Sequence, residues 1–206
     1  MSSIFLSHSQ NDKSLIDVFL QAFSGTTVRP ILMEYEKFQN PPWNEIQNKI
    51  QMASALFVLL GNNLKSSDYT QNWVSYEVGL ADGLRRQIWV FEDINNEVIF
   101  PIPHIHHYLM YDSNDRSSLN YLKQIIASYA VNPVGAIAGL VLTAALVSNP
   151  IGWILGGLIG SKVGVPTRPS GVNLQCGYQD CKVQFKFYNE NKTIRCPSCR
   201  RTFTWR

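Results

Sequence analysis

Apolar and polar positions alternate between two patterns along the first 130 residues. Short apolar runs have the length of β-strands, and they fall at 4–7, 28–33, 55–60, 88–91 and 107–111. Between these runs, apolar residues recur every three or four positions, as in amphipathic helices, at 12–23, 43–52, 73–84 and 119–126. Residues 61–72 are polar, and we expect a loop there. Repeated strand–helix units of this size predict an α/β fold with right-handed crossovers and a mainly parallel sheet.

The run at 55–60 (ALFVLL) has no polar position, which is expected of a central parallel strand buried on both faces. Ligands of such sheets bind beyond the carboxyl ends of the strands. His8, the loop at 34–42 and the polar stretch 61–72 all follow strand-like runs. We therefore expect a ligand site where these three segments meet.

The next segment, 131–165, is an apolar stretch of a different kind. No charged residue occurs from Gln124 through Ser161, and glycines recur at every fourth position from Gly152 to Gly164. A glycine ladder lets helices approach closely, either in a membrane or in an oligomer. We expect a glycine-zipper helical hairpin that turns near Pro150.

The third part of the chain carries all four cysteines. After a linker at 166–175, they form two pairs in the segment 176–206, and they are Cys176, Cys181, Cys196 and Cys199. Two thiolate pairs separated by a hairpin-length stretch suit tetrahedral Zn²⁺. A module this small buries too little core to fold alone, so a structural zinc ion would stabilise it. The pattern resembles zinc ribbons.

Composition and charge refine this division into segments. A hydrophobic content of 45% is ample for a packed core. The net charge of +3 hides an acidic head, with 9 Lys/Arg against 13 Asp/Glu in 1–130, and a basic tail. No secretory signal follows Met1, and clustered cysteines in an unexported protein favour metal binding over disulfides. The basic and aromatic tail is compatible with nucleic-acid binding, with anionic lipid, or with a purely structural ribbon.

Three stretches of the head carry a resemblance to a known family. Phe5-Leu6-Ser7-His8-Ser9 followed by Asn11-Asp12, the loop from Tyr35 to Trp43, and Trp73-Val74-Ser75-Tyr76-Glu77 occur in this order. Together with the central apolar strand, they resemble TIR domains over roughly residues 1–130.

The resemblance implies a flavodoxin-like fold and, for the enzymatic prokaryotic and archaeal branch, NAD⁺ hydrolase or ADP-ribosyl cyclase activity. Glu77 would then be the catalytic residue. The residues that would bind NAD⁺ are Phe5, Ser7, His8, Phe38, Trp43 and Trp73. The products would be nicotinamide and ADP-ribose or a cyclic ADP-ribose isomer of the 2′ or 3′ type, a signal suited to antiviral defence.

The helical spacing around Glu77 supports a functional interpretation. A glutamate on an amphipathic helix is usually solvated, but Trp73, Glu77 and Leu84 share the apolar face here. Burial of a charge is costly and calls for a purpose. Trp73 suits packing as well as substrate contact, and Phe38 and Trp43 suit either base stacking or core anchoring.

Three histidines, His104, His106 and His107, also invite a metal interpretation. His104 and His106 would project from one strand face, but no third ligand is evident in the sequence. We therefore expect no metal at these histidines.

Two functions remain open at the sequence level. The first is an NAD⁺-cleaving enzyme that self-associates through its TIR domain and its glycine ladder, at the cytoplasmic face of a membrane or in the cytoplasm. The second is a non-catalytic TIR scaffold that acts by domain association, and a weaker third is a deoxyribosyltransferase-like enzyme. An inward-facing Glu77 favours an enzyme, because a scaffold has no need of a buried carboxylate.

Overall fold

The structure is a computed structural model that describes residues 1–33, 43–96, 98, 100, 102, 105–130, 168–188 and 193–205. The strands are β1 (Ser3–Ser7), β2 (Arg29–Ile31), β3 (Ala55–Leu60), β4 (Gln87–Asp93), β5 (His107–Tyr111), β6 (Val172–Gln175), β7 (Gln184–Phe187), β8 (Thr193–Arg195) and β9 (Thr202–Thr204). The helices are α1 (Lys13–Phe23), α2 (Trp43–Met52), α3 (Asn62–Ser66), α4 (Asp68–Gly83) and α5 (Arg116–Ala127).

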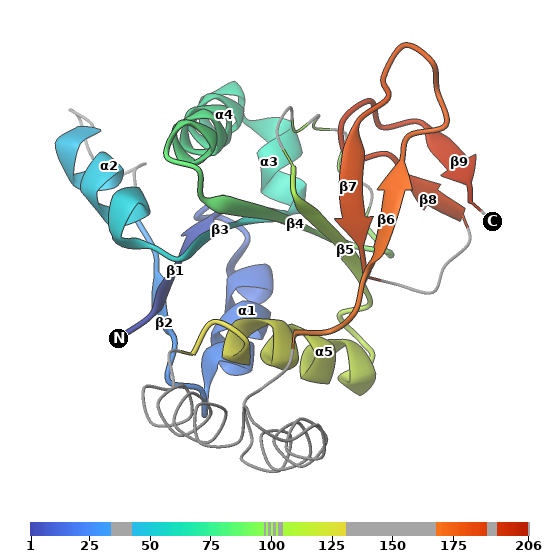
Figure 1. Cartoon of the computed structure of the whole chain (residues 1–206). Helices are drawn as coiled ribbons and strands as arrows, with labels where there is room; N and C mark the ends of the chain where they lie inside the picture. The colour runs from blue at the N-terminus through green and yellow to red at the C-terminus, as the bar shows by residue number, and fades with distance from the viewer. Residues whose placement is uncertain are drawn as a thin grey trace, which may run out of the picture.

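One seven-stranded sheet organises the molecule, with the order β2-β1-β3-β4-β5-β7-β6 (Figure 1). Every neighbouring pair from β2 to β7 is parallel, and only β6 and β7 run antiparallel. The first five strands follow the 2-1-3-4-5 order of flavodoxin-like folds. The predicted α/β class and the mainly parallel sheet are confirmed.

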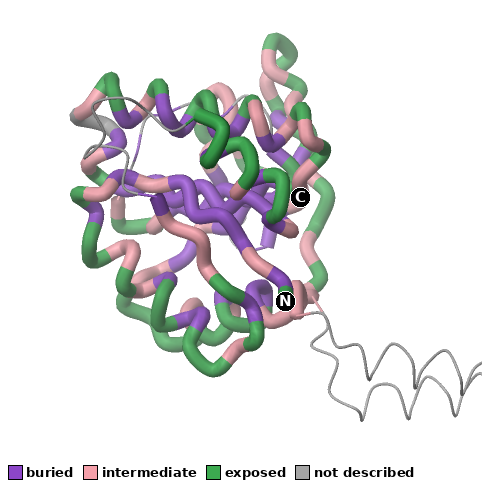
Figure 2. Tube along the Cα trace, turned by 90° about the vertical axis from the view of Figure 1, so that its left-hand side faces the viewer, coloured by how far each residue is buried: buried purple, intermediate pink, exposed green. Residues whose placement is uncertain are grey.

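Helices cover both faces of this sheet, as parallel strands require (Figure 1). One hydrophobic cluster packs α2, α3 and α4 on one face, and the other packs α1 and α5 on the opposite face. All six residues of β3 are buried between them, and the buried part of the chain runs through the centre of the molecule (Figure 2). Aromatic side chains such as Phe57, Trp89 and Phe91 fill the α1–α5 side.

The tail joins the head through the same sheet, a feature that the sequence did not predict. β7 pairs in parallel with β5, with His107 opposite Lys186 and Tyr108 opposite Phe187. The Lys186 amide donates to the carbonyl of His106 over 2.9 Å. β8 and β9 form a separate two-stranded sheet, which carries the last two cysteines between its strands.

The loop predicted at 61–72 is wrong, because this stretch holds α3 and the first turns of α4. Ser67 begins α4 as its N-cap and accepts a hydrogen bond from the amide of Thr70 over 3.3 Å. Serine is a preferred N-cap residue, and the polar residues around it tolerate helical structure at the surface. Polarity alone therefore misidentified a capped helix start as a loop.

The predicted localisation at the cytoplasmic face of a membrane is also wrong. Within the described ranges, no helix combines the length and the hydropathy needed to cross a bilayer. The longest of these helices, α4, has 16 residues. It therefore spans about 24 Å, less than the roughly 30 Å of a bilayer's hydrocarbon core. The hairpin predicted at 131–165 lies outside the described residues.

His107 stands where the tail meets the head and is buried there. Its ring stacks on Trp89 with a centroid separation of 4.2 Å, and its Nδ1 lies 2.8 Å from the hydroxyl of Tyr188. Burial, and then the nearby charges of Arg168, His106 and Lys186, lower the pKa of His107 to about 3. The folded protein therefore holds a neutral imidazole at this position.

We predict that this imidazole makes the protein sensitive to acid. Since the pKa of His107 is about 3 when folded and 6.5 when unfolded, its contribution is complete above about pH 6.5 and decreases as the pH falls toward 3. The loss is on the order of 4 kcal/mol across this window. His107→Phe keeps the aromatic stack and should flatten this part of the stability profile, measured by urea unfolding at several pH values.

The matched control is His106→Gln, which removes an exposed imidazole one residue away. It should retain most of the wild-type dependence of unfolding free energy on pH, because burial, and not His106, is the largest cause of the His107 shift. Equal slopes for wild type and His107→Phe between pH 6.5 and 3 would contradict the assignment.

Candidate functional site

Glu77 lies on the inner face of α4. The buried residues of this helix are Thr70, Trp73, Val74, Glu77, Val78 and Ala81, which follow the helical repeat. Only 1% of the Glu77 surface is exposed, so the carboxylate is inside the protein. The sequence expectation that this side chain points inward agrees with its burial.

Aromatic rings gather beside Glu77 on α4 and α2. Trp73, one helical turn before Glu77, is buried and stacks on Trp43, with ring centroids 5.0 Å apart. Tyr76 meets Trp43 edge-on at 5.0 Å, and Tyr69 meets Trp73 at 5.9 Å. Trp43 is 50% exposed, so the outer surface of this aromatic cluster faces solvent. A flat ring arriving from solvent would find an aromatic surface here.

The end of β1 contributes to the same face of the sheet. Phe5 belongs to the hydrophobic cluster that contains Trp73, whereas Ile4 and Leu6 belong to the opposite cluster. Because side chains alternate along a strand, Ser7 lies on the Glu77 side with Phe5. Phe5 is fully buried and Ser7 is 1% exposed, so both line the interior and not the open surface.

Two further residues predicted to bind NAD⁺ differ in how far the structure describes them. His8 is half-buried just after β1, and its Nδ1 lies 2.9 Å from the carbonyl of Leu6, which orients the ring. Phe38 belongs to the stretch 34–42, which lies outside the described residues. The structure thus brings Phe5, Ser7, Trp43 and Trp73 to one side of the sheet together with Glu77.

Asp12 connects two loops at the carboxyl edge of the sheet, a role that its place after Asn11 in the sequence does not reveal. Its Oδ1 accepts hydrogen bonds from the amide of Asn63 at 3.0 Å and from that residue's Nδ2 at 2.7 Å. A Cβ at Gly61 would lie 2.1 Å from Asp12 Oδ2, so only glycine allows this approach. These contacts tie the loops after β1 and β3 together at the carboxyl edge of the sheet.

A cavity of about 340 Å³ lies at that edge, between the ends of β3, β4 and β5 and the start of α1. Asp12 and Asp93 line it together with Tyr111. Burial, and then the carboxylates of Asp93 and Asp12, raise the pKa of Tyr111 well above its ordinary value, so its hydroxyl stays protonated. The lining residues come from several strand ends, which is where ligands of parallel sheets bind.

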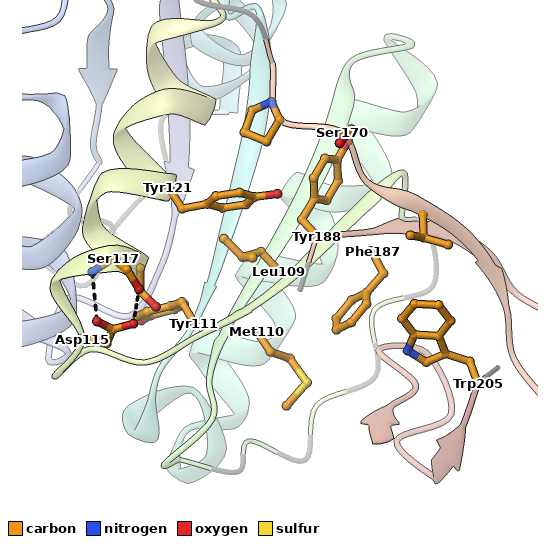
Figure 3. A pocket seen from close by; sticks show the side chains of 13 residues that line it. Leu109, Met110, Tyr111, Asp115, Ser117, Tyr121, Ser170, Phe187, Tyr188 and Trp205 are labelled. Atoms are coloured by element: carbon orange, nitrogen blue, oxygen red, sulfur yellow. Dashed lines mark hydrogen bonds between the residues drawn. The ribbon is translucent and has the colours of Figure 1, made fainter. Parts of the chain in front are cut away.

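A larger cavity, of about 1040 Å³, opens between α5 and the tail (Figure 3). Tyr121 and Tyr188 face each other across one part of it, and Phe187 and Trp205 line another. Asp115, at its edge, accepts a hydrogen bond from the amide of Ser117 as the N-cap of α5. The polar groups drawn at this end of the cavity are therefore engaged in capping the helix.

The four cysteines converge on one point. Their Sγ atoms all lie within 4.8 Å of one another, with Cys176 and Cys199 at 3.7 Å and Cys181 and Cys196 at 3.8 Å. Four sulfurs around a tetrahedral ion at about 2.3 Å would be separated by about 3.8 Å. The thiols fit a metal ion in both number and spacing, and this cluster could hold one.

The thiol environments differ within this centre. Burial raises the pKa of Cys176 and of Cys196. Burial opposes ionisation of Cys199 too, but hydrogen bonds from the backbone and the guanidinium of Arg201 lower its pKa to about 6. One thiolate is thus present at neutral pH, and metal ligation requires the thiolate form.

Three of the seven basic residues of the tail pair with carboxylates. Arg195 and Arg200 both bind the buried carboxylate of Glu92, and Arg201 binds Asp180. The aromatic residues that would stack on bases, Phe185, Phe187 and Tyr188, are buried in the core. Arg195 and Arg200 and these three buried rings are therefore not available to a nucleic acid.

Comparisons with known proteins find one distant structural likeness. No family model matches the chain, and no curated protein matches it. A search of solved structures finds the TIR domains of the activated Roq1 resistosome that directly recognises the pathogen effector XopQ, at 13% identity and a TM-score of 0.37. The match covers 47% of this chain and 60% of that one. The order of the strands, and not this match, establishes the flavodoxin-like α/β fold.

We predict that the full chain binds one thiophilic metal ion through the four cysteines. Titration with Co²⁺ under reducing conditions should give thiolate–metal charge-transfer absorption that saturates at one ion per chain. Cys196→Ala should abolish that saturation, because it removes a fully buried ligand. His106→Gln, outside the cluster, should titrate as wild type does, and saturation by the Cys196→Ala protein would exclude a four-cysteine centre.

Proposed function

We propose that this protein cleaves NAD⁺ at the bond between nicotinamide and ribose, with Glu77 as the catalytic carboxylate. The observation that carries the proposal is the burial of Glu77 beside an aromatic cluster that opens to solvent at Trp43. An ionisable group in such an environment is a functional candidate on physical grounds. The resemblance of three stretches of the head to TIR domains supports the same assignment.

The chemistry asks little of the enzyme besides electrostatics and position. Nicotinamide leaves as a neutral molecule from a positively charged ring, so its departure needs no acid. The barrier is the positive charge that develops on the ribose, which a fixed carboxylate such as that of Glu77 stabilises. The same carboxylate can accept hydrogen bonds from the 2′ and 3′ hydroxyls and so orient the sugar.

The acceptor of the ribosyl group determines the product. Attack by water gives ADP-ribose, whereas attack by a hydroxyl of the adenosine ribose gives a cyclic ADP-ribose isomer. We assign Trp43 and Trp73 to the aromatic surface for the nicotinamide or the adenine ring. The half-buried His8 would form the polar part of the site at the end of β1, next to the buried Ser7. Phe38 lies in the stretch 34–42, outside the described residues, and its contact with NAD⁺ stays a prediction from the sequence.

We further propose that the ion in the cysteine centre is structural Zn²⁺. Four thiolates leave no coordination position for substrate, which is the arrangement of closed structural zinc sites. The centre lies in the tail whereas Glu77 lies on α4, and we assign the ion no direct part in the cleavage. Its role in the proposal is to hold the end of the chain folded.

Self-association is the remaining element of the proposed function. The glycine ladder at 152–164 favours close packing between copies of the chain. If assembly completes the site, deletion of 131–165 lowers the activity per chain at low protein concentration.

The proposal predicts that Glu77→Gln lowers nicotinamide release by at least about 100-fold, as expected when a charge-stabilising group is lost. Incubation with NAD⁺ and mass analysis of the products measure this loss and identify ADP-ribose or a cyclic isomer. The matched control is Glu45→Gln, which removes an exposed glutamate on α2 that pairs with Lys49. It should react as wild type does.

Equal turnover by wild type and Glu77→Gln would sink the catalytic assignment. If wild-type protein fails to consume NAD⁺ even after clustering, a scaffold that acts by domain association becomes the better description. Circular dichroism and thermal unfolding of each variant separate loss of chemistry from loss of fold.

A further inference from the structure

A buried carboxylate links the cysteine centre to the sheet of the head. Glu92 lies near the carboxyl end of β4 and is fully buried. Its Oε1 accepts hydrogen bonds from Arg195 at 3.0 Å and from Arg200, and its Oε2 accepts one from the hydroxyl of Tyr108. A buried carboxylate is stable only with such partners, because desolvation of a charge is expensive.

The two arginines that satisfy Glu92 flank the second cysteine pair. Arg195 directly precedes Cys196, and Arg200 directly follows Cys199. The turn between them is closed by the Arg200 amide, which donates to the carbonyl of Cys196 over 2.8 Å, and by the Cys196 amide, which donates to the carbonyl of Arg201 over 2.9 Å. The same turn therefore places two sulfurs and two guanidinium groups.

A second contact reaches the head from inside this turn. The carbonyl of Pro197, between the two cysteines, accepts a hydrogen bond from the amide of Ile102 over 3.1 Å. Arg200 has a positive φ of 62°, a conformation that non-glycine residues adopt only where the surrounding structure holds it. Its side chain is 6% exposed, so its position is fixed between the turn and Glu92.

We propose that metal binding by the four cysteines is coupled to the order of the head sheet through the contacts of Arg195 and Arg200 with Glu92. With the ion bound, the turn is held and both guanidinium groups face the carboxylate. With the ion removed, the turn loosens, Glu92 loses its compensation, and β4 and β5 open at their carboxyl ends. Coupling of this kind is reciprocal. If metal binding stabilises the contacts with Glu92, loss of the Glu92 charge weakens metal binding.

This inference goes beyond NAD⁺ cleavage and depends only on a metal ion in the cysteine centre. The surface pair Arg201–Asp180 offers a matched comparison within the same module. Its two side chains are 40% and 70% exposed, and neither belongs to the head. Exposed pairs contribute little, so this pair should not transmit the coupling.

The test uses the full chain and Zn²⁺, with two readouts other than activity. The first is hydrogen exchange followed by mass spectrometry on peptides that cover 87–93 and 107–111, before and after a chelator removes the ion. We expect exchange there to rise at least about tenfold, following the free energy of local opening. The second is Zn²⁺ affinity, measured by competition with a chromogenic chelator.

Glu92→Gln should weaken Zn²⁺ binding at least about tenfold, whereas Asp180→Asn should leave it within about twofold of wild type. If Glu92→Gln does not fold, Arg195→Gln takes its place, since it removes one of the two guanidinium groups and leaves Arg200 on the carboxylate.

Wild-type affinity in the folded Glu92 or Arg195 variant overturns the proposal. Unchanged hydrogen exchange in β4 and β5 after metal removal also overturns it. A loss of Zn²⁺ affinity in Asp180→Asn as large as that in Glu92→Gln does the same. A full chain that binds no Zn²⁺ overturns both this coupling and the metal assignment, and leaves NAD⁺ cleavage untouched.

Discussion

A parallel sheet must be covered on both faces, and the structure depends on how this chain meets that requirement. All six residues of β3 are buried, so helices must cover both of its faces. α4 packs on one face and α1 on the other. The edge beyond β5 raises a second requirement, because an open edge presents unpaired backbone groups. β7 meets it by pairing with His107 and Tyr108, so a segment that follows the head by many residues completes its sheet.

The tail in turn gains from this pairing. Its residues are too few to bury a core of their own, so a short cysteine-bearing module needs outside support. Metal ligation is one source, and docking of Phe185 and Phe187 into the cluster beneath α4 is another. The cluster that buries Trp73 and Val78 of α4 thus contains tail residues as well. Head and tail therefore share one core on this side of the sheet.

Much of the head could be predicted from the sequence, because its signals are local. ALFVLL identifies a central strand without reference to any partner, and the recurrence of apolar residues in α1 and α5 identifies helices. The spacing of Trp73 and Glu77 was sufficient to predict that the carboxylate faces inward. The convergence of four cysteines could be predicted because two close pairs have few other arrangements.

What the sequence could not show depends on partners far along the chain. From the sequence, Glu92 is the polar end of a predicted strand. No residue near it in the sequence indicates that Arg195 and Arg200 will pair with it in the interior. Asp12 gains its role only when Gly61 brings the loop after β3 against it. The polar stretch 61–72 formed helices because Ser67 capped α4, a contact that polarity does not reveal.

The basic tail shows most clearly why charge counts mislead. Its net positive charge suggested a surface for nucleic acid, yet two of its arginines compensate one buried carboxylate and a third pairs with Asp180. A charge that is committed to an internal partner is unavailable to an external polyanion, since leaving Glu92 uncompensated would cost several kcal/mol. Part of the positive charge of the tail therefore compensates negative charge of the head. This compensation takes place at Glu92, inside the protein. The difference in charge between the two segments thus arises in part because they fold against each other.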